Sequence, residues 1–369
     1  MSTPVLLKRW LYTAACGLWF ACLPAQSDEE AILNIYNWAD YIDPYSIKEF
    51  EEEYGIHVNY DLYDSSEIVD TKLMTGNSGY DLIFHSVAFS ARLIPIGAYQ
   101  PVDFSRLKNW HHIDKRILAR ISKATGTELY GVPYMWGTTG FAYNVEMVKE
   151  RMSNAPLTSA DLIFKPENAA KFADCGISLL DDPTSVIPMA MLYLGLPVDS
   201  VEAEHLAAVE ELLGNIRPYI KYFSSNKMIV DLPSKEICIG MSWSGDFSQA
   251  QSRAIEAGLD IKLNYFVPIE GAVDWYDNIY IPVDAEHVDN AHKFLDFLLR
   301  PEVIARASNY IGYANANKTS TTLVDPIFTE NPAIYPDEEV QKLLTSNKIL
   351  LPKQERKRSR SWTRIKAGL

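Results

Sequence analysis

Short apolar runs alternate with amphipathic stretches in the first part of the chain, a pattern that predicts strands alternating with helices. Strand-length apolar runs cover residues 32–36, 56–60 and 80–84. Between the first two, Asp43 and Pro44 are expected to begin a helix that Gly55 ends. Ser65 is expected to begin a second helix that reaches Gly76. This order predicts a mainly parallel sheet with helices on both faces.

A second α/β unit is expected around residues 135–255, with a helix near 206–213 and a strand at 237–241. Another strand at 261–267 and a helix at 289–299, stopped by Pro301, follow it. The chain is too long for one hydrophobic core, so two lobes are predicted. Lobe 1 is expected to comprise residues 26–134 plus about 256–318. Lobe 2 is expected to comprise residues 135–255 plus about 319–369, with short crossovers and a cleft between the lobes.

The N-terminus has the layout of a secretory signal peptide, predicted to span residues 1–25. Lys8 and Arg9 precede an apolar stretch at 10–23, which Pro24, Ala25 and a polar, acidic run follow. That stretch is shorter than the roughly 20 residues of a membrane span. Export is therefore expected, with a buried N-terminal helix as the alternative. Cys22 leaves a lipid anchor open, although the aromatic residues before it fit a lipoprotein cleavage site poorly.

Two cysteines, Cys175 and Cys238, remain after the predicted signal peptide, and we expect them to form a disulfide. Exported proteins occupy compartments in which disulfides persist. The alternative is a pair of buried free thiols, because a sequence does not show whether two Cα atoms lie close enough to be bridged.

The composition is that of a globular protein, with 47% hydrophobic and 22% charged residues and a formal net charge of −14. A negative field of this size disfavours nucleic acid as a partner and attracts cations. Solubility alone also accounts for most of these charges.

Tryptophan and acidic residues recur together in three distant places, each after a strand-like run. The pairs are Trp38 with Asp40, Trp243 with Asp246, and Trp275 with Asp277. An aromatic face beside a carboxylate suits a ligand that is both apolar and cationic. Ligands of parallel α/β sheets bind beyond the carboxyl ends of the strands, where Trp38, Asp40 and Ser86 fall. Folding is therefore expected to gather the three pairs around one pocket.

Signals for catalysis, metals and cofactors are weak. Residues 240–244 nearly match a nucleophile elbow, but the second glycine, Gly245, comes one residue late. The seven histidines show no ligand spacing for a metal. Gly137 and Gly140 lie too close together for a phosphate-binding loop, and no lysine follows. The chain is therefore expected to bind a ligand rather than to catalyse a reaction, with no metal and no cofactor.

Several motifs in this order resemble the periplasmic polyamine-binding proteins of bacterial ABC transporters. They are the sequences at 37–41 (NWADY), 134–140 (YMWGTTG), 180–183 (LDDP), 243–246 (WSGD), 313–318 (YANANK) and 362–364 (WTR). The resemblance covers essentially the whole chain after residue 25. It implies a two-lobed periplasmic-binding-protein fold of type II that closes on a polyamine in the periplasm. A membrane permease is the implied partner, and a monomer is expected.

Carried over residue by residue, the resemblance implies three kinds of ligand contact. The aromatic residues implied to line the ligand are Trp38, Tyr41, Trp243, Trp275 and Tyr313. The acids implied to meet its ammonium groups are Asp246 and Asp277, with Asp40 and Ala39 beside Trp38. The hydroxyl positions are Ser86, Ser185 and Ser225. Acids for the amines and aromatic rings for the methylenes satisfy both halves of a polyamine.

Two departures from the family pattern favour spermidine over putrescine. Ser185 stands where putrescine-binding relatives have Glu, and Trp275 stands where they have Phe. A tryptophan at the latter position is associated with spermidine preference in the family. Two alternatives stay open: a receptor or sensor subunit for putrescine or another cationic amine, and an exported enzyme that processes amines.

Overall fold

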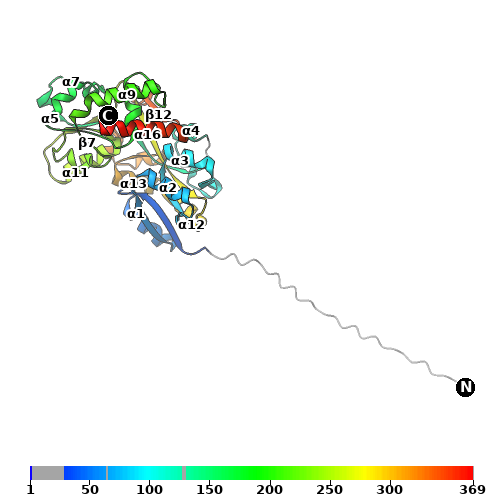
Figure 1. The fold of residues 1–369 in the computed structure, drawn as a ribbon. Helices are drawn as coiled ribbons and strands as arrows, with labels where there is room; N and C mark the ends of the chain where they lie inside the picture. Colours follow the sequence, from blue (N-terminus) through cyan, green and yellow to red (C-terminus); the bar gives the residue numbers. More distant parts are fainter. Residues whose placement is uncertain (2–28, 64, 127–129, 369) are drawn as a thin grey trace.

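The structure is a computed structural model that describes Met1 and residues 29–63, 65–126 and 130–368. Apart from Met1, the predicted signal peptide, with Cys16 and Cys22, lies outside the described residues. In the described part the chain folds into two α/β lobes, so the predicted fold class is confirmed (Figure 1).

The first lobe begins with the predicted β–α–β–α–β order. Its elements are β1 (Ile32–Trp38), α1 (Pro44–Tyr54), β2 (His57–Tyr63), α2 (Ser66–Thr75), β3 (Leu82–Ser86), α3 (Val87–Leu93), β4 (Tyr99–Gln100) and α4 (Lys115–Thr125). The caps explain the first helix: the Asp43 carboxylate accepts a hydrogen bond from the Tyr45 amide, and Gly55 ends α1 in the left-handed region at φ 67°.

The second lobe starts along the long strand β5 (Val132–Asn144). Its elements are α5 (Val145–Arg151), α6 (Asp161–Phe164), α7 (Pro166–Ala169), β6 (Ile177–Leu179), α8 (Pro183–Tyr193), α9 (Ala203–Ile216), β7 (Ile220–Phe223), α10 (Met228–Asp231), β8 (Ile239–Trp243), α11 (Ser244–Glu256) and β9 (Leu263–Phe266).

The chain then returns to the first lobe and ends on the second. The remaining elements are β10 (Ala272–Pro282), α12 (Val288–Leu298), α13 (Pro301–Ile311), β11 (Ala314–Asn315), α14 (Pro326–Thr329), α15 (Glu338–Lys342), β12 (Leu344–Ser346) and α16 (Pro352–Ala367). Pro301, expected to stop a helix, also occupies the first position of α13.

Two crossing strands join the lobes. The described strands follow the order β2-β1-β3-β10-β5-β8-β6-β7. Three parallel strands lie at each end of this order, β2-β1-β3 in the first lobe and β8-β6-β7 in the second. Strands β10 and β5 run antiparallel to their neighbours in between. One part of β5 pairs with β10, and its far part pairs with β8 and β9.

Each lobe has its own core, which agrees with the expectation of two cores. Leu33, Phe50 and Phe294 are buried in the first, and Phe141, Leu162 and Val209 in the second. The division of the chain into these ranges stays a prediction. Strand β9, which the sequence suggested for lobe 1, pairs with the part of β5 that also pairs with β8.

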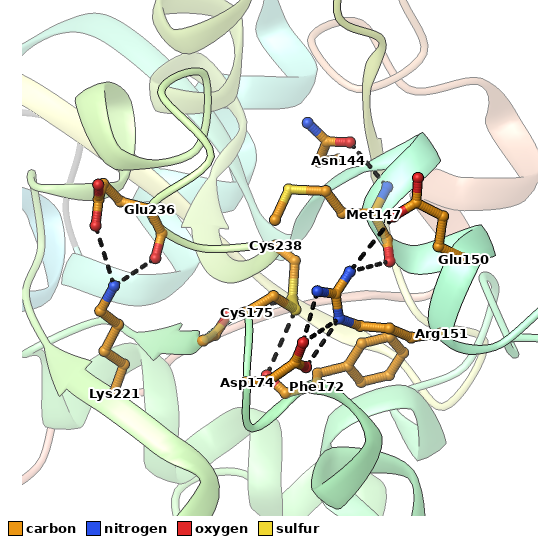
Figure 2. Close-up of a disulfide and its surroundings, with 11 residues drawn as sticks. Asn144, Met147, Glu150, Arg151, Phe172, Asp174, Cys175, Lys221, Glu236 and Cys238 are labelled. Atoms are coloured by element: carbon orange, nitrogen blue, oxygen red, sulfur yellow. Dashed lines mark hydrogen bonds and ion pairs between the residues drawn. A yellow bond between two sulfur atoms is a disulfide. The ribbon is translucent and has the colours of Figure 1, made fainter.

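Cys175 and Cys238 form a disulfide, with Cα atoms 5.6 Å apart, as predicted (Figure 2). The two residues precede β6 and β8, which are adjacent and parallel, so the pairing brings them together at the same end of the sheet. The Cys238 amide also donates to the Gly176 carbonyl at 3.0 Å. Arg151 binds Asp174 beside the bridge, with its Nη2 atom 2.7 Å from Oδ2 (Figure 2).

Candidate ligand-binding site

A cavity of about 310 Å³ lies between the two lobes. All twelve residues singled out in the sequence line it: Trp38, Ala39, Asp40, Tyr41, Ser86, Ser185, Ser225, Trp243, Asp246, Trp275, Asp277 and Tyr313. Its size falls within the range of small-molecule sites. The structure thus brings all of these side chains together, and their contact with a ligand stays a prediction.

The residues that the first lobe contributes to the cavity wall lie at the ends of strands and in the middle of one strand. Trp38 ends β1, and its ring lies 4.4 Å from that of Tyr63, which ends the adjacent strand β2. Ser86 ends β3 and is directly paired with Asp277 of the antiparallel strand β10. The neighbouring strands therefore place a hydroxyl next to a carboxylate in the cavity wall.

The expectation that all three tryptophan–acid pairs follow strands is wrong for the third pair. Trp275 and Asp277 lie inside β10, which continues to Pro282. This strand passes between the lobes, so its middle rather than its end faces the cleft. Trp275 is paired with Gly137 of β5, which leaves room for the indole, and its ring meets the Tyr313 ring edge-on at 5.2 Å.

Asp246 is the acid that the second lobe supplies. Trp243 ends β8, α11 begins at the next residue, and Asp246 lies in the first turn of that helix with 6% of its surface exposed. The Tyr313 hydroxyl donates a hydrogen bond to its Oδ1 atom. Burial raises the pKa of Asp246 to about 7, and this hydrogen bond opposes the rise.

Asp277 is the matching acid of the first-lobe side, 8% exposed. Burial raises its pKa to about 7, while the neighbouring Tyr41 hydroxyl lowers it. Tyr41 packs edge-on against Tyr134 and Tyr313, with ring centroids 5.6 Å apart in each case. The two carboxyl groups therefore sit in an apolar, aromatic setting where only a cation of suitable shape compensates their charge.

A chain of hydrogen bonds runs along the cavity wall at the start of α8. The Trp243 indole nitrogen donates to the Ser185 hydroxyl at 3.2 Å, and Ser185 donates to Asp182 Oδ2 at 2.6 Å. Asp182 is the N-cap of α8 and also accepts from the Thr184 amide at 2.8 Å. The LDDP motif has the same form whether its second acid only caps a helix or also faces a cavity, so the sequence alone did not place Asp182 in the cavity wall.

The charged residues that line the cavity in the described part of the chain are all acidic. No lysine or arginine of the described residues lines it, whereas six aspartates do. Two of these are already neutralised, Asp274 by Arg120 and Asp181 by Lys366 at 2.7 Å. In the described part of the chain the other four form no ion pair with a basic residue: Asp40, Asp182, Asp246 and Asp277. Such a site favours a ligand with more than one positive charge.

Sequence reasoning missed several other lining residues, among them Tyr63, Phe89, Gln249 and Asn347. None stands in a pattern of its own in the sequence. Phe89 follows Ser86 by three positions, so one turn of α3 carries both into the wall. That spacing is a signal from which Phe89 could have been predicted.

The described residues contain neither a metal-binding cluster nor a helix that could span a membrane. No group of three or more His, Cys, Asp or Glu side chains there is arranged to hold a metal ion. Within residues 29–63, 65–126 and 130–368 no helix is both long and apolar enough to cross a membrane.

Comparisons with known proteins identify the family of this chain. The family described as bacterial extracellular solute-binding protein matches residues 46–336. The putrescine-binding periplasmic protein SpuD of Pseudomonas aeruginosa strain UCBPP-PA14 is 43% identical over 345 residues, which cover 93% of this chain and 94% of SpuD. The putrescine-binding periplasmic protein PotF of Escherichia coli K12 is 41% identical over 366 residues, or 98% of this chain and 99% of PotF.

Among solved structures, the putative spermidine/putrescine ABC transporter of Listeria monocytogenes matches with a TM-score of 0.81 and 28% identity. The match covers 91% of this chain and 99% of that one. These relatives confirm the resemblance noted in the motifs, and the names of SpuD and PotF agree with the expected periplasmic location. They also agree with a binding protein rather than an enzyme. The chain belongs to the bacterial extracellular solute-binding proteins.

Proposed function

We propose that this protein is the receptor that captures a polyamine in the periplasm and delivers it to an ABC permease. The observation that carries the proposal is the pair Asp246 and Asp277, two buried carboxyl groups without a basic partner in the described residues, in a cavity walled by aromatic rings. Each terminal ammonium of a polyamine can meet one acid, while the methylenes pack against the rings.

The relatives and the cavity favour different polyamines. SpuD and PotF are named as putrescine-binding proteins, and they share 43% and 41% of their residues with this chain. Two features of the cavity favour spermidine. Trp275 offers a longer flat surface than a phenylalanine would, and Ser185 stands where the resemblance implies an acid in putrescine-binding proteins. Beside Ser185, the Asp182 carboxylate lines the cavity and accepts a hydrogen bond from the Ser185 hydroxyl.

We infer that spermidine is the preferred ligand and that putrescine also binds. A longer amine reaches from Asp246 and Asp277 toward Asp182, whereas the shorter one leaves that end of the cavity without an ammonium. Under this proposal Trp38, Ala39, Asp40, Tyr41, Ser86, Ser225 and Tyr313 form the remaining ligand contacts.

Calorimetry of the purified protein tests this function. Titration with spermidine, putrescine, cadaverine and agmatine at pH 7.5 is expected to give micromolar or tighter binding of at least one polyamine, with spermidine the tightest. Absence of binding to all four overturns the proposed function. Tightest binding of putrescine overturns the preference alone and agrees with the names of the relatives.

A further inference from the structure

Two helices from different lobes meet beside the cavity. Helix α3 starts directly after Ser86, and its residues Val87 and Phe89 line the cavity. Helix α16 packs on the second core through Trp362 and Ile365, which are buried there. Figure 1 shows α16, in red, running past α3, in cyan, where the two lobes adjoin.

Arg92 in the last turn of α3 contacts both lobes. Its Nη2 atom binds the Asp70 carboxylate of α2, in its own lobe. Its Nη1 atom lies 3.9 Å from Glu355 Oε1 of α16, in the other lobe. The Arg92 and Glu355 side chains are 22% and 18% exposed, so water and salt screen this pair less than a fully exposed one.

Both partners of this cross-lobe pair are held in place by their own lobe. Glu355 accepts two hydrogen bonds from Arg358 Nη2, at 2.6 and 2.8 Å, and Arg358 is 6% exposed. Asp70 fixes Arg92 in the same way from the other side. Lost conformational freedom of the side chains is the usual cost of a surface ion pair. Here that cost is small, because each group is already held by its own lobe before the pair forms.

Arg92 is also connected to the cavity. Its guanidinium lies over the ring of Phe89, 4.6 Å from the centroid, and Phe89 lines the cavity wall. A ligand whose methylenes pack against Phe89 restricts the motion of the ring and, through it, of the guanidinium. The same side chain thus touches a cavity wall and the opposite lobe.

We propose that Arg92 and Glu355 form a latch that holds the two lobes closed over a bound ligand. The latch rests on the proposed receptor function, and it assigns Arg92 and Glu355 a positioning role rather than contact with the ligand. Opening the lobes separates α3 from α16 and breaks this pair, while Arg92–Asp70 and Glu355–Arg358 persist within their lobes. The latch therefore governs release of the ligand more than its capture.

The variant Glu355→Gln tests the latch, because Gln keeps a hydrogen-bond acceptor for Arg358 and leaves Arg92 paired with Asp70. Stopped-flow tryptophan fluorescence is expected to show dissociation of spermidine, or of the tightest amine found by calorimetry, accelerated by about two- to fivefold, the range for a partly exposed ion pair. The association rate should change little. In a double-mutant cycle, adding Arg92→Gln to Glu355→Gln should give less than the product of the single effects.

Glu210→Gln is the matched control, since Glu210 of α9 binds Arg364 of the same helix α16 within one lobe. Its dissociation rate should equal that of the wild type. Equal dissociation rates for Glu355→Gln and the control, or strictly multiplicative effects in the cycle, overturn the latch while leaving the receptor function intact. A wild-type protein that binds no amine overturns the receptor function itself, so the two failures are distinguishable.

Discussion

The Tyr313 hydroxyl donates a hydrogen bond to the Asp246 carboxylate, and this contact joins the two lobes at the cavity. Tyr313 follows α13 of the first lobe, and Asp246 lies in the first turn of α11 in the second. Gly245 permits the approach, because a Cβ atom there would overlap the Tyr313 ring. Asp246 is thus positioned by a neutral partner, which leaves its charge for a cationic ligand.

Removing either buried acid should weaken ligand binding and stabilise the unliganded protein. Asp246→Asn and Asp277→Asn are each expected to cost about 2–5 kcal/mol of binding free energy, the range for breaking a buried charge pair. Each should also raise the Tm of the unliganded protein, on the order of 2–4 °C for every kcal/mol of burial cost removed. Calorimetry and thermal melts check both effects. Asp260→Asn, at an exposed position, is the control and should change neither quantity.

Affinity for the polyamine should depend on pH around neutrality. In the unliganded protein the pKa values of Asp246 and Asp277 are raised to about 7, and an ammonium beside each acid lowers them. Binding therefore releases protons below pH 7, so affinity should rise from pH 5.5 to 8 and then level off. Calorimetry in buffers of different ionisation enthalpy measures the released protons. Constant affinity across this range would contradict the assignment.

The same two groups make the unliganded protein lose stability as pH rises. Their pKa values are raised above the ordinary aspartate value, so the folded state binds more protons than the unfolded state between about pH 4 and pH 7. Their contribution to the free energy of unfolding is therefore largest near pH 4 and declines toward pH 7. Denaturant titrations of wild type and Asp246→Asn should show a smaller decline in the variant.

The proposed preference for spermidine over putrescine is predicted to depend on Trp275. Its indole packs over Gly137 and against Tyr313, so Trp275→Phe removes ring surface from the cavity wall. The ratio of spermidine to putrescine affinity is expected to fall by about three- to tenfold, the effect of losing the area of one or two buried methylenes. Competition binding measures the ratio directly. An unchanged ratio of the two affinities would show that Trp275 does not determine the preference.

Much of the fold and the site could be predicted because the signals are local. Asp43, Pro44 and Gly55 mark the ends of α1 whatever surrounds them, and Trp38 follows a strand-like run that the structure confirms as β1. The motifs that resemble polyamine-binding proteins contain seven of the twelve residues that were placed in the cavity, and the family pattern supplied the other five: Ser86, Ser185, Ser225, Trp275 and Asp277. Neighbouring parallel strands then bring Trp38 and Ser86 to the same edge of the sheet.

What could not be predicted depends on contacts between distant segments. Trp275 and Asp277 were expected after a strand, and the sequence around them does not show that β10 continues to Pro282 across both lobes. Asp182 has the sequence of an ordinary helix cap, so its link to Ser185 appears only in three dimensions. The pairing of Arg92 with Glu355 likewise has no signal in either segment.

The disulfide should stabilise the second lobe without taking part in binding. The bridge closes a loop with a sequence separation of 63 residues, and neither cysteine lines the cavity. Replacing both cysteines, Cys175→Ser with Cys238→Ser, is expected to lower the free energy of unfolding by about 2–4 kcal/mol. Polyamine affinity at 25 °C should stay within about twofold of the wild type if the lobe remains folded. Wild type treated with reductant should melt like the double variant, and equal Tm values with and without reductant would contradict the prediction.

Gly137 should be required for the position of Trp275. A Cβ atom at residue 137 would lie 2.5 Å from the Trp275 indole and 2.6 Å from the Ser244 hydroxyl. Gly137→Ala is therefore expected to cost about 1–3 kcal/mol of stability through overpacking and to weaken polyamine binding as the indole shifts. Gly214→Ala is the control, because no atom lies within 4 Å of a Cβ there, and alanine favours the interior of helix α9.

A second variant separates displacement of the indole from a general defect of β5. In a Trp275→Phe background the smaller ring leaves room for the new methyl group, so Gly137→Ala should then cost less stability than it does in the wild type. Thermal melts of the two single variants and the double variant provide this cycle. Equal costs in both backgrounds would show that Gly137 serves the strand pairing of β5 with β10 rather than the placement of Trp275.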